Sequence, residues 1–181
     1  MKNIYLYAAH TSFSPGGVLW DRNEHSDVMK FVKYLGSVLS CNENLHVKVL
    51  TGNIKPLPDA HAVFIFHRDW NDTHNRKHGC AVYTVRDSNV RIQYDAYRLL
   101  ESITGEGAFR YNGVHSHHVR EGFSSLNNTL CENTFLFTLG YMDSFRDNTI
   151  FDRNVYILAR RFAHKVNEMY EEKKNEDNTG I

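Results

Sequence analysis

The chain has 181 residues, which is long enough for one domain with a full hydrophobic core and leaves little room for a second. Lysine plus arginine and aspartate plus glutamate both number 21, so the sequence lacks the excess of positive charge that dedicated nucleic-acid-binding proteins carry. The three cysteines are far apart and form no Cys-x-x-Cys pair, which argues against a disulfide framework or a cysteine zinc knuckle. We therefore expect one compact domain whose leading partner is not nucleic acid.

The first apolar stretch, residues 4–9, is too short for the core of a signal peptide and is not followed by a cleavage signal. No stretch approaches the roughly 20 apolar residues that a membrane-spanning helix needs. We therefore expect no membrane insertion and a protein that is made in the cytoplasm of the producing cell and initially stays there.

Short apolar runs alternate with longer amphipathic segments along the chain. Several of the runs are apolar at every position, as central parallel strands require. This alternation predicts an α/β fold, a single domain with a mostly parallel central sheet and helices on both faces. The predicted strands are residues 4–9, 46–50, 62–66, 81–85 and 135–141.

Helical periodicity occurs in three segments, in which apolar residues recur every three or four positions. Asp152 or Asn154 is a suitable cap for the last of these helices. Residues 171–180 contain no apolar side chain that a core could bury, so we expect a folded domain over residues 1–172 and a disordered tail over residues 173–181. The apolar stripes are Val28, Phe31, Val32, Leu35 and Leu39; Ile92, Ala96, Leu99 and Ile103; and Val155, Leu158, Phe162, Val166 and Met169.

Three residues that are able to bind a metal lie at the ends of predicted strands or at the start of a predicted helix. His10 follows the first predicted strand, His67 follows the third, and Glu24 begins the first long helix. In open α/β sheets, ligands bind beyond the carboxyl ends of the strands, so two imidazoles at neighbouring strand ends can converge there. Two imidazoles and one carboxylate are the ligands of many hydrolytic zinc sites. The alternatives are loop histidines bonded to backbone and a glutamate that interacts favourably with the helix dipole.

The surroundings of these residues form a longer pattern. The first strand is followed by a histidine, then by a pair of glycines, and then by the glutamate that begins the first helix. A second strand is followed by a histidine, an asparagine and a later strand that contains a tyrosine. A third strand precedes the last helix. These segments are residues 7–24, 64–83 and 135–143. In this order the chain resembles the zinc-dependent N-acetylmuramoyl-L-alanine amidases of bacteria and their phages. Ala9 replaces the family's glycine before the first histidine, and the family's arginine-rich middle helix is shortened.

The resemblance implies an amidase-like catalytic domain over residues 1–172, with one Zn²⁺ ion held by His10, Glu24 and His67. It implies hydrolysis of the amide between N-acetylmuramic acid and L-alanine, and bacterial peptidoglycan as the partner. Because the sequence shows no secretion signal, we expect a phage-type lysin that reaches the cell wall through a membrane pore or with a virion.

One position departs from the family. Thr138 stands where the family has a glutamate that is taken to be the general base, and a threonine hydroxyl is not a base near neutral pH. Zinc alone can activate the water while Thr138 hydrogen-bonds the nucleophile or the oxyanion. Another group can take the role of the base, such as a loop carboxylate or a histidine of the run 115–118. The remaining alternatives are a different amide as substrate and a catalytically silent protein that binds the cell wall.

Three further residues are candidates for substrate binding. Trp20 precedes Glu24 by four residues and Trp70 follows His67 by three, so both rings are expected at the rim of the site, together with Asn71. Such rings can stack on a sugar or a peptide face, and the alternative is that they are partly buried caps over the core. The run 115–118, with three histidines, is expected to be a solvated loop.

Overall fold

The computed structural model describes the chain apart from residues 71–76, 86–87, 117–125, 127 and 180–181, and for residues 172–179 it describes the backbone only. In the described part of the chain, six strands form one sheet in the order β4-β1-β5-β8-β6-β7. The strands β4, β1, β5 and β8 run parallel, whereas β6 is antiparallel to β8 and parallel to β7. Their bounds are β1 Lys2–Ala8, β4 Leu45–Thr51, β5 Ala62–Asp69, β6 Cys80–Thr84, β7 Tyr111–Ser116 and β8 Thr134–Tyr141. The predicted α/β class and mostly parallel sheet are confirmed.

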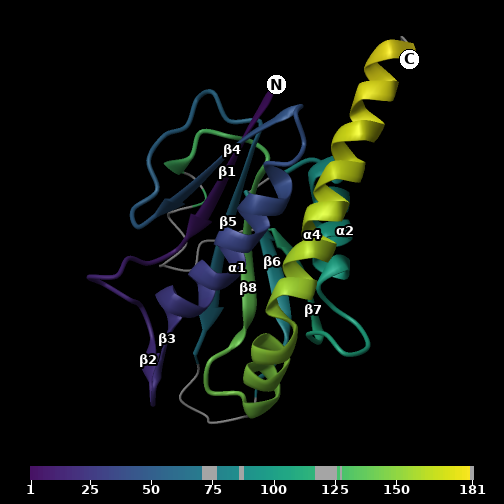
Figure 1. Ribbon diagram of the computed structural model, residues 1–181. Coiled ribbons are helices and arrows are strands. Elements are labelled where there is room, and N and C mark those ends of the chain that lie inside the picture. Colours follow the sequence, from purple (N-terminus) through teal and green to yellow (C-terminus); the bar gives the residue numbers. More distant parts are fainter. Residues whose placement is uncertain (71–76, 86–87, 117–125, 127, 180–181) are drawn as a thin grey trace.

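Three long helices cover one face of this sheet (Figure 1). They are α1 (Glu24–Leu39), α2 (Val90–Ser102) and α4 (Phe145–Thr179). Helix α1 packs on β1, β4 and β5, and α2 packs on β6 and β7. Helix α4 lies between them and contacts β8 and both other helices. None of the helices in the described residues is long and apolar enough to cross a lipid bilayer.

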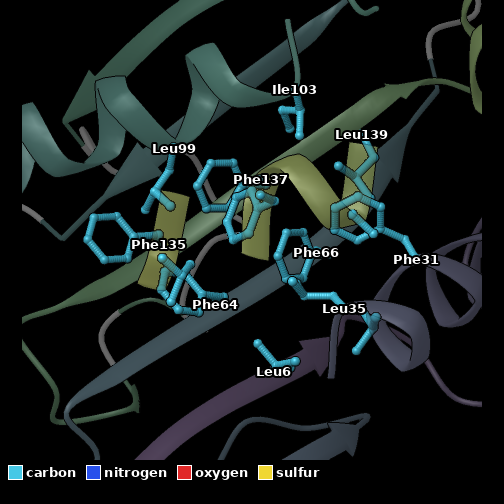
Figure 2. Packing of buried hydrophobic residues seen from close by; sticks show 14 of the residues in the cluster. Leu6, Phe31, Leu35, Phe64, Phe66, Leu99, Ile103, Phe135, Phe137 and Leu139 are labelled. Atoms are coloured by element: carbon cyan, nitrogen blue, oxygen red, sulfur yellow. The ribbon is translucent and has the colours of Figure 1, made fainter. Parts of the chain in front are cut away.

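The main core lies between the sheet and these helices and includes a group of phenylalanines (Figure 2). Because successive strand residues point to opposite faces, alternate positions of β5 and β8 meet the helices. Phe64 stacks on Phe135 and Phe66 stacks on Phe137, each pair with ring centroids 5.5 Å apart. Phe162 of α4 meets three of these rings edge to face. Each buried ring contributes about 1.5–3 kcal/mol, so this cluster anchors α4 on the sheet.

A smaller core covers the opposite face of the sheet. It contains Tyr5, Tyr7, Val63, Ile65 and Leu136, which are the other alternate positions of β1, β5 and β8. The residues that pack on them include Leu50 at the end of β4, Ile54, Leu57 and Ala60 in the loop that follows it, and Leu126 and Cys131. The three long helices α1, α2 and α4 therefore lie on one face of the sheet, and shorter connecting segments, in which Leu126 and Asn128 are helical, pack on the other.

Two sets of strands were not predicted. A short hairpin of β2 (Val18–Leu19) and β3 (Arg22–Asn23) precedes α1, and β7 forms one edge of the sheet. The expected loop over residues 115–118 is wrong for His115 and Ser116, which belong to β7; His117 and His118 lie outside the described residues. An edge strand pairs on one side only, so its sequence needs no continuous apolar run.

Helix α4 begins at Phe145, so neither Asp152 nor Asn154 is its cap, as we had expected. The Ser144 hydroxyl accepts from the backbone N–H of Asp147 at 3.2 Å, which is the contact of a cap. The apolar periodicity did not predict this early start of α4, because the first turn of the helix buries the polar side chains of Asp147 and Asn148 instead of apolar ones. The helix continues to Thr179, through the domain boundary expected at residue 172.

Candidate metal and active site

The fold brings His10, Glu24 and His67 together at the carboxyl edge of the sheet. β1 and β5 are neighbouring parallel strands; His10 lies two residues beyond β1, and His67 lies near the end of β5. Glu24 is the first residue of α1, where the Asn23 side chain caps the helix. Glu24 Oε2 lies 3.2 Å from His10 Nε2, and Glu24 Oε1 lies 3.8 Å from His67 Nδ1. The glutamate thus stands between the two imidazoles, as predicted from strand ends.

Backbone groups hold the Glu24 carboxylate in place. The N–H of Gly17 donates to Oε2 at 3.2 Å, and the N–H of Arg68 donates to Oε1 at 3.1 Å. Gly16 lets the loop approach this closely, since its φ is +76° and a Cβ there would lie 2.5 Å from Glu24 Oε2 and 2.6 Å from His10 Cδ2. A glycine is required at this position both by the backbone conformation and by the contact.

The electrostatics of the three groups are mutually dependent. Burial opposes ionisation of Glu24, yet the hydrogen bond from His10 and the nearby imidazoles hold the pKa of its carboxyl below the ordinary value. The hydrogen bond to Glu24 in turn raises the pKa of His10. Burial lowers the pKa of His67 against the attraction of Glu24 and Asp69. A neutral imidazole and an ionised carboxylate are the forms that bind a metal.

Thr138 lies beside His67 on the neighbouring strand. The two residues are paired in the parallel register of β5 and β8, and both point to the face away from the helices. Thr138 Oγ1 lies 2.9 Å from His67 Nε2, which is hydrogen-bond distance. The residue at the position of the family's glutamate therefore contacts the ring of a candidate ligand.

Arg68 is a central residue of the site that we did not predict. Its side chain is fully buried and points to the helix face, where its guanidinium contacts Asp27 at 2.6 Å and Asn148 at 2.7 Å. It also donates to the carbonyl oxygens of Leu139 and Tyr141. One sequence signal was available: an arginine in a strand whose alternate residues face helices needs a buried acid, and Asp27 lies on the buried face of α1.

Two more polar residues next to the site were also missed. Asp69 lies two residues after His67 and pairs in register with Tyr141 of β8. Burial, followed by the charge of Asp69, raises the pKa of Tyr141 to about 12. The phenol hydroxyl of Tyr141 is therefore protonated at neutral pH and hydrogen-bonds the Asp69 side chain.

The two tryptophans are both accessible to solvent, Trp20 more so than Trp70. Trp20 occupies the turn between β2 and β3, is 75% exposed and has φ +56°. Trp70 directly follows β5 and is 46% exposed. Asn71, the third candidate substrate-binding residue, lies outside the described residues. Figure 1 shows the β2–β3 hairpin projecting from the same end of the molecule at which α1 begins.

The donor chemistry fits a zinc ion, although the described residues include no group of three His, Cys, Asp or Glu side chains already spaced as a metal site. His10, Glu24 and His67 provide two nitrogens and a carboxylate, the donors zinc uses. Glu24 Oε1 and His67 Nδ1 are 3.8 Å apart, too far for a hydrogen bond between them.

Several solved structures share the fold of this chain. The chain resembles the catalytic domain of CwlV, an N-acetylmuramoyl-L-alanine amidase from Bacillus (Paenibacillus) polymyxa var. colistinus, with a TM-score of 0.77 and 17% identity over 94% of this chain and 99% of that chain. It resembles the N-acetylmuramoyl-L-alanine amidase of Clostridium difficile 630 with a TM-score of 0.77 and 15% identity, over 95% of this chain and 98% of that chain.

A third resemblance is to the catalytic domain of the CD27L endolysin, which targets Clostridia difficile, with a TM-score of 0.71 and 12% identity over 93% of this chain and 98% of that chain. Neither the protein-family models nor the curated proteins give a match. The chain therefore has the fold of N-acetylmuramoyl-L-alanine amidase catalytic domains, which confirms the resemblance stated from the sequence.

Proposed function

We propose that this protein is a zinc-dependent peptidoglycan hydrolase that cleaves the amide between N-acetylmuramic acid and L-alanine. The observation that carries the proposal is the convergence of His10, Glu24 and His67 at the carboxyl edge of the sheet. This edge is where open α/β sheets bind their ligands. The amidase fold of the whole chain supports the choice of substrate.

His10, Glu24 and His67 would hold the ion, which would supply Lewis-acid polarisation of the amide carbonyl and lower the pKa of a water molecule. The chain itself prepares the ligands. Two backbone N–H groups orient Glu24 and favour its ionised form. The Tyr141 hydroxyl, which stays protonated, hydrogen-bonds the Asp69 side chain beside the site.

We propose that catalysis is slower than a glutamate base would permit, since Thr138 cannot accept a proton at neutral pH. General bases contribute about 10²–10⁴-fold to rates. The second candidate function is a catalytically silent domain that binds the cell wall. The observation that favours it is the contact between Thr138 and His67, because the side chain at the base position is bonded to a candidate ligand.

Trp20 and Trp70 would form the rim on which a sugar or peptide of the substrate stacks, and Asn71 would be a further substrate-binding residue. Their exposure supports this role, because an accessible aromatic ring is free to stack on a ligand. We further propose the role of a phage-type lysin, which the likeness to an endolysin catalytic domain supports. Such a protein would remain in the producing cell's cytoplasm until a membrane pore or a virion gave it access to the wall.

Metal analysis of the purified protein, combined with an assay for free muramic-acid ends released from peptidoglycan, tests the proposal. We expect one zinc ion per chain and release that is lost in His10→Ala. The matched control is His164→Ala, because the His164 ring is 74% exposed on α4. Absence of zinc from wild type, with unchanged behaviour of His10→Ala, would contradict the proposal.

Two further measurements distinguish hydrolysis of the lactyl-alanine amide from hydrolysis of a different amide and from binding without catalysis. Mass spectrometry that finds cleaved stem peptides with intact lactyl-alanine bonds would indicate a different amide. Sedimentation with sacculi without any release, together with bound zinc, would favour the silent wall-binding protein. Release gained in Thr138→Glu would then show that the metal site is competent and that only the base is absent.

A further inference from the structure

A hollow of about 470 Å³ lies beside the edge strand β7, between α2 and the first turn of α4. Its described lining contains none of the candidate metal ligands, which lie on or near other strands. The side chains that give the hollow its chemical character are Tyr97, Glu101, Arg110, Tyr111 and Arg146.

Two tyrosine rings form one part of this hollow. The rings of Tyr97 and Tyr111 meet edge to face, with centroids 6.1 Å apart and planes at 71°. The two residues are 40% and 45% exposed, so a ligand is able to reach part of each ring. The buried ring of Phe109 adds apolar surface between α2 and α4. Accessible aromatic surfaces of this kind are suited to the face of a sugar ring.

Two arginines form another part. In the described part of the chain, Arg146 forms no hydrogen bond or ion pair, and the Arg110 guanidinium contacts only the ring of His78, at 3.4 Å. Glu101 is the acid of the described lining, and its carboxylate accepts from the Tyr97 hydroxyl at 2.9 Å. A guanidinium binds a carboxylate with two parallel N–H donors. The hollow therefore suits a ligand that joins a ring to a carboxylate.

The hollow and the candidate metal site lie at the same end of the sheet. Tyr111 pairs with the first residue of β6, Cys80, and the next residue of β6 pairs with Thr138 of β8. Thr138 in turn pairs with His67 of β5. Because neighbouring strands are 4.7–4.9 Å apart, these three steps amount to about 15 Å. One polymeric ligand is long enough to contact both places.

Hydrolysis of the proposed amide creates a ligand of the required kind. Water adds its oxygen to the lactyl carbonyl carbon, the C–N bond breaks, and the nitrogen leaves as the amine of L-alanine. The lactyl group becomes a carboxylic acid, which is ionised at neutral pH. The cleaved strand therefore has a sugar ring beside a carboxylate, where the uncleaved strand has a sugar ring beside a neutral amide.

We propose that this hollow is a product-binding subsite that holds N-acetylmuramic acid of a glycan strand from which the stem peptide has been removed. The sugar ring packs on Tyr97 and Tyr111, and the lactyl carboxylate binds Arg110 and Arg146. The product role rests on the proposed function, whereas binding of the sugar acid is a property of the hollow alone. A protein held by strands that it has already cleaved would stay close to the next uncleaved amide.

The first test is titration of the purified protein with N-acetylmuramic acid, followed by ¹⁵N–¹H NMR of the backbone amides. The matched probe is N-acetylglucosamine, which is the same sugar without the lactyl group. We expect shifts at Gly105 and Tyr111, with an affinity at least about tenfold higher for the acid than for the neutral sugar. Equal affinities, or shifts confined to Gly16 and Gly17 beside the candidate metal ligands, would overturn the proposal.

The second test uses charge changes that act in opposite directions. Arg110→Gln and Arg146→Gln should each weaken binding of N-acetylmuramic acid about threefold to tenfold. Glu101→Gln keeps an oxygen for the Tyr97 hydroxyl but removes a negative charge, so it should strengthen binding about twofold to fivefold.

Arg160→Gln is the control for these changes, since Arg160 is an exposed arginine farther along α4. It should leave the affinity unchanged, and all four variants should leave the binding of N-acetylglucosamine unchanged. An equal effect of Arg160→Gln and Arg146→Gln, or weaker binding in Glu101→Gln, would contradict the subsite.

The failures of the subsite and of the proposed function are distinguishable. If peptidoglycan releases no muramic-acid ends while N-acetylmuramic acid shifts Gly105 and Tyr111, the proposed function is wrong and the binding site stands. If muramic-acid ends are released but N-acetylmuramic acid causes no shifts at these two residues, the subsite is wrong and the proposed function stands.

Discussion

The Arg68 guanidinium lies 2.6 Å from the Asp27 carboxylate, while the backbone N–H of the same arginine donates to Glu24 Oε1 at 3.1 Å. Asp27 and Glu24 are separated by three positions in the first turn of α1. Arg68 therefore fixes the start of this helix twice, once through its side chain and once through its backbone. The candidate ligand depends on the backbone contact, and the stability of the fold depends on the side chain.

Arg68→Met should destabilise the protein by about 3–5 kcal/mol, because it removes one partner of a buried ion pair. Urea unfolding with zinc removed measures this change. The zinc affinity of the folded variant should stay within a few-fold of wild type, because methionine keeps the backbone N–H that holds Glu24.

Asp152→Asn is the matched change, because Asp152 is an exposed acid that is linked to Asp27 through Arg22. Asp152 binds Arg22, which also binds Asp27, but its side chain is 54% exposed. We expect a loss below about 1 kcal/mol. Equal losses in the two variants would contradict the central role of Arg68.

Gly16→Ala should disrupt the site beyond the cost of its backbone strain. Gly107→Ala provides the comparison, since Gly107 has φ +69° against +76° at Gly16 but has no atom within 4 Å of the Cβ position. Both variants incur the left-handed penalty of about 1–2 kcal/mol. Only Gly16→Ala adds a clash with Glu24 and His10, so zinc binding should be lost in that variant alone. Zinc titration checks this, and intact binding in Gly16→Ala would refute the close approach.

The pair His10–Glu24 should make metal-free stability depend on pH in a defined direction. The raised pKa of His10 adds stability below the ordinary value of 6.5, and this stability is lost as pH rises through the folded-state pKa. The lowered pKa of Glu24 adds stability above its ordinary value of 4.5, and this stability is lost as pH falls through the folded-state pKa. The pair therefore contributes most between these two values.

Urea unfolding of wild type and Glu24→Gln in chelator measures this contribution. The stability of wild type relative to the variant should be greater at about pH 5.5 than at about pH 8. The reverse order, or no dependence on pH, would show that the two side chains are not coupled as the structure has them.

Trp20→Gly should raise stability while it weakens binding to the cell wall. Trp20 has φ +56°, a conformation that glycine adopts without strain, so the free energy of unfolding should rise by up to about 1 kcal/mol. Loss of the exposed ring should weaken sedimentation with sacculi about threefold to tenfold.

Leu130→Gly is the control for that substitution. Leu130 has φ +58° and is 72% exposed, but it lies before the amino end of β8, whereas the candidate site lies at the carboxyl ends of the strands. It should gain similar stability with unchanged sedimentation. A parallel loss of binding in both glycine variants would argue against Trp20 as a contact.

The predicted strands and helices largely agree with the structure, because long apolar runs and stripes report burial directly. The stripe through Phe31, Leu35 and Leu39 packs on the sheet as expected. The missed start of α4 and the missed strand β7 share one cause. Both segments contain polar residues whose hydrogen-bond partners are distant in the chain. Asp147 in the first turn of α4 accepts from the backbone N–H of Gly79, and Asn112 in the edge strand β7 donates to the carbonyl oxygen of His78.

The sequence by itself determined the α/β class and the three residues that meet at the carboxyl edge, His10, Glu24 and His67. Strand ends and a helix start are local properties, and the parallel order then brings them together. Only the tertiary structure decided the contacts around them. The Thr138 bond to His67 depends on the register of β5 and β8, and the Arg68 contact with Asp27 depends on how α1 lies on the sheet. Hydrogen bonds need atoms within about 3 Å, and spacing along a chain does not specify positions that closely.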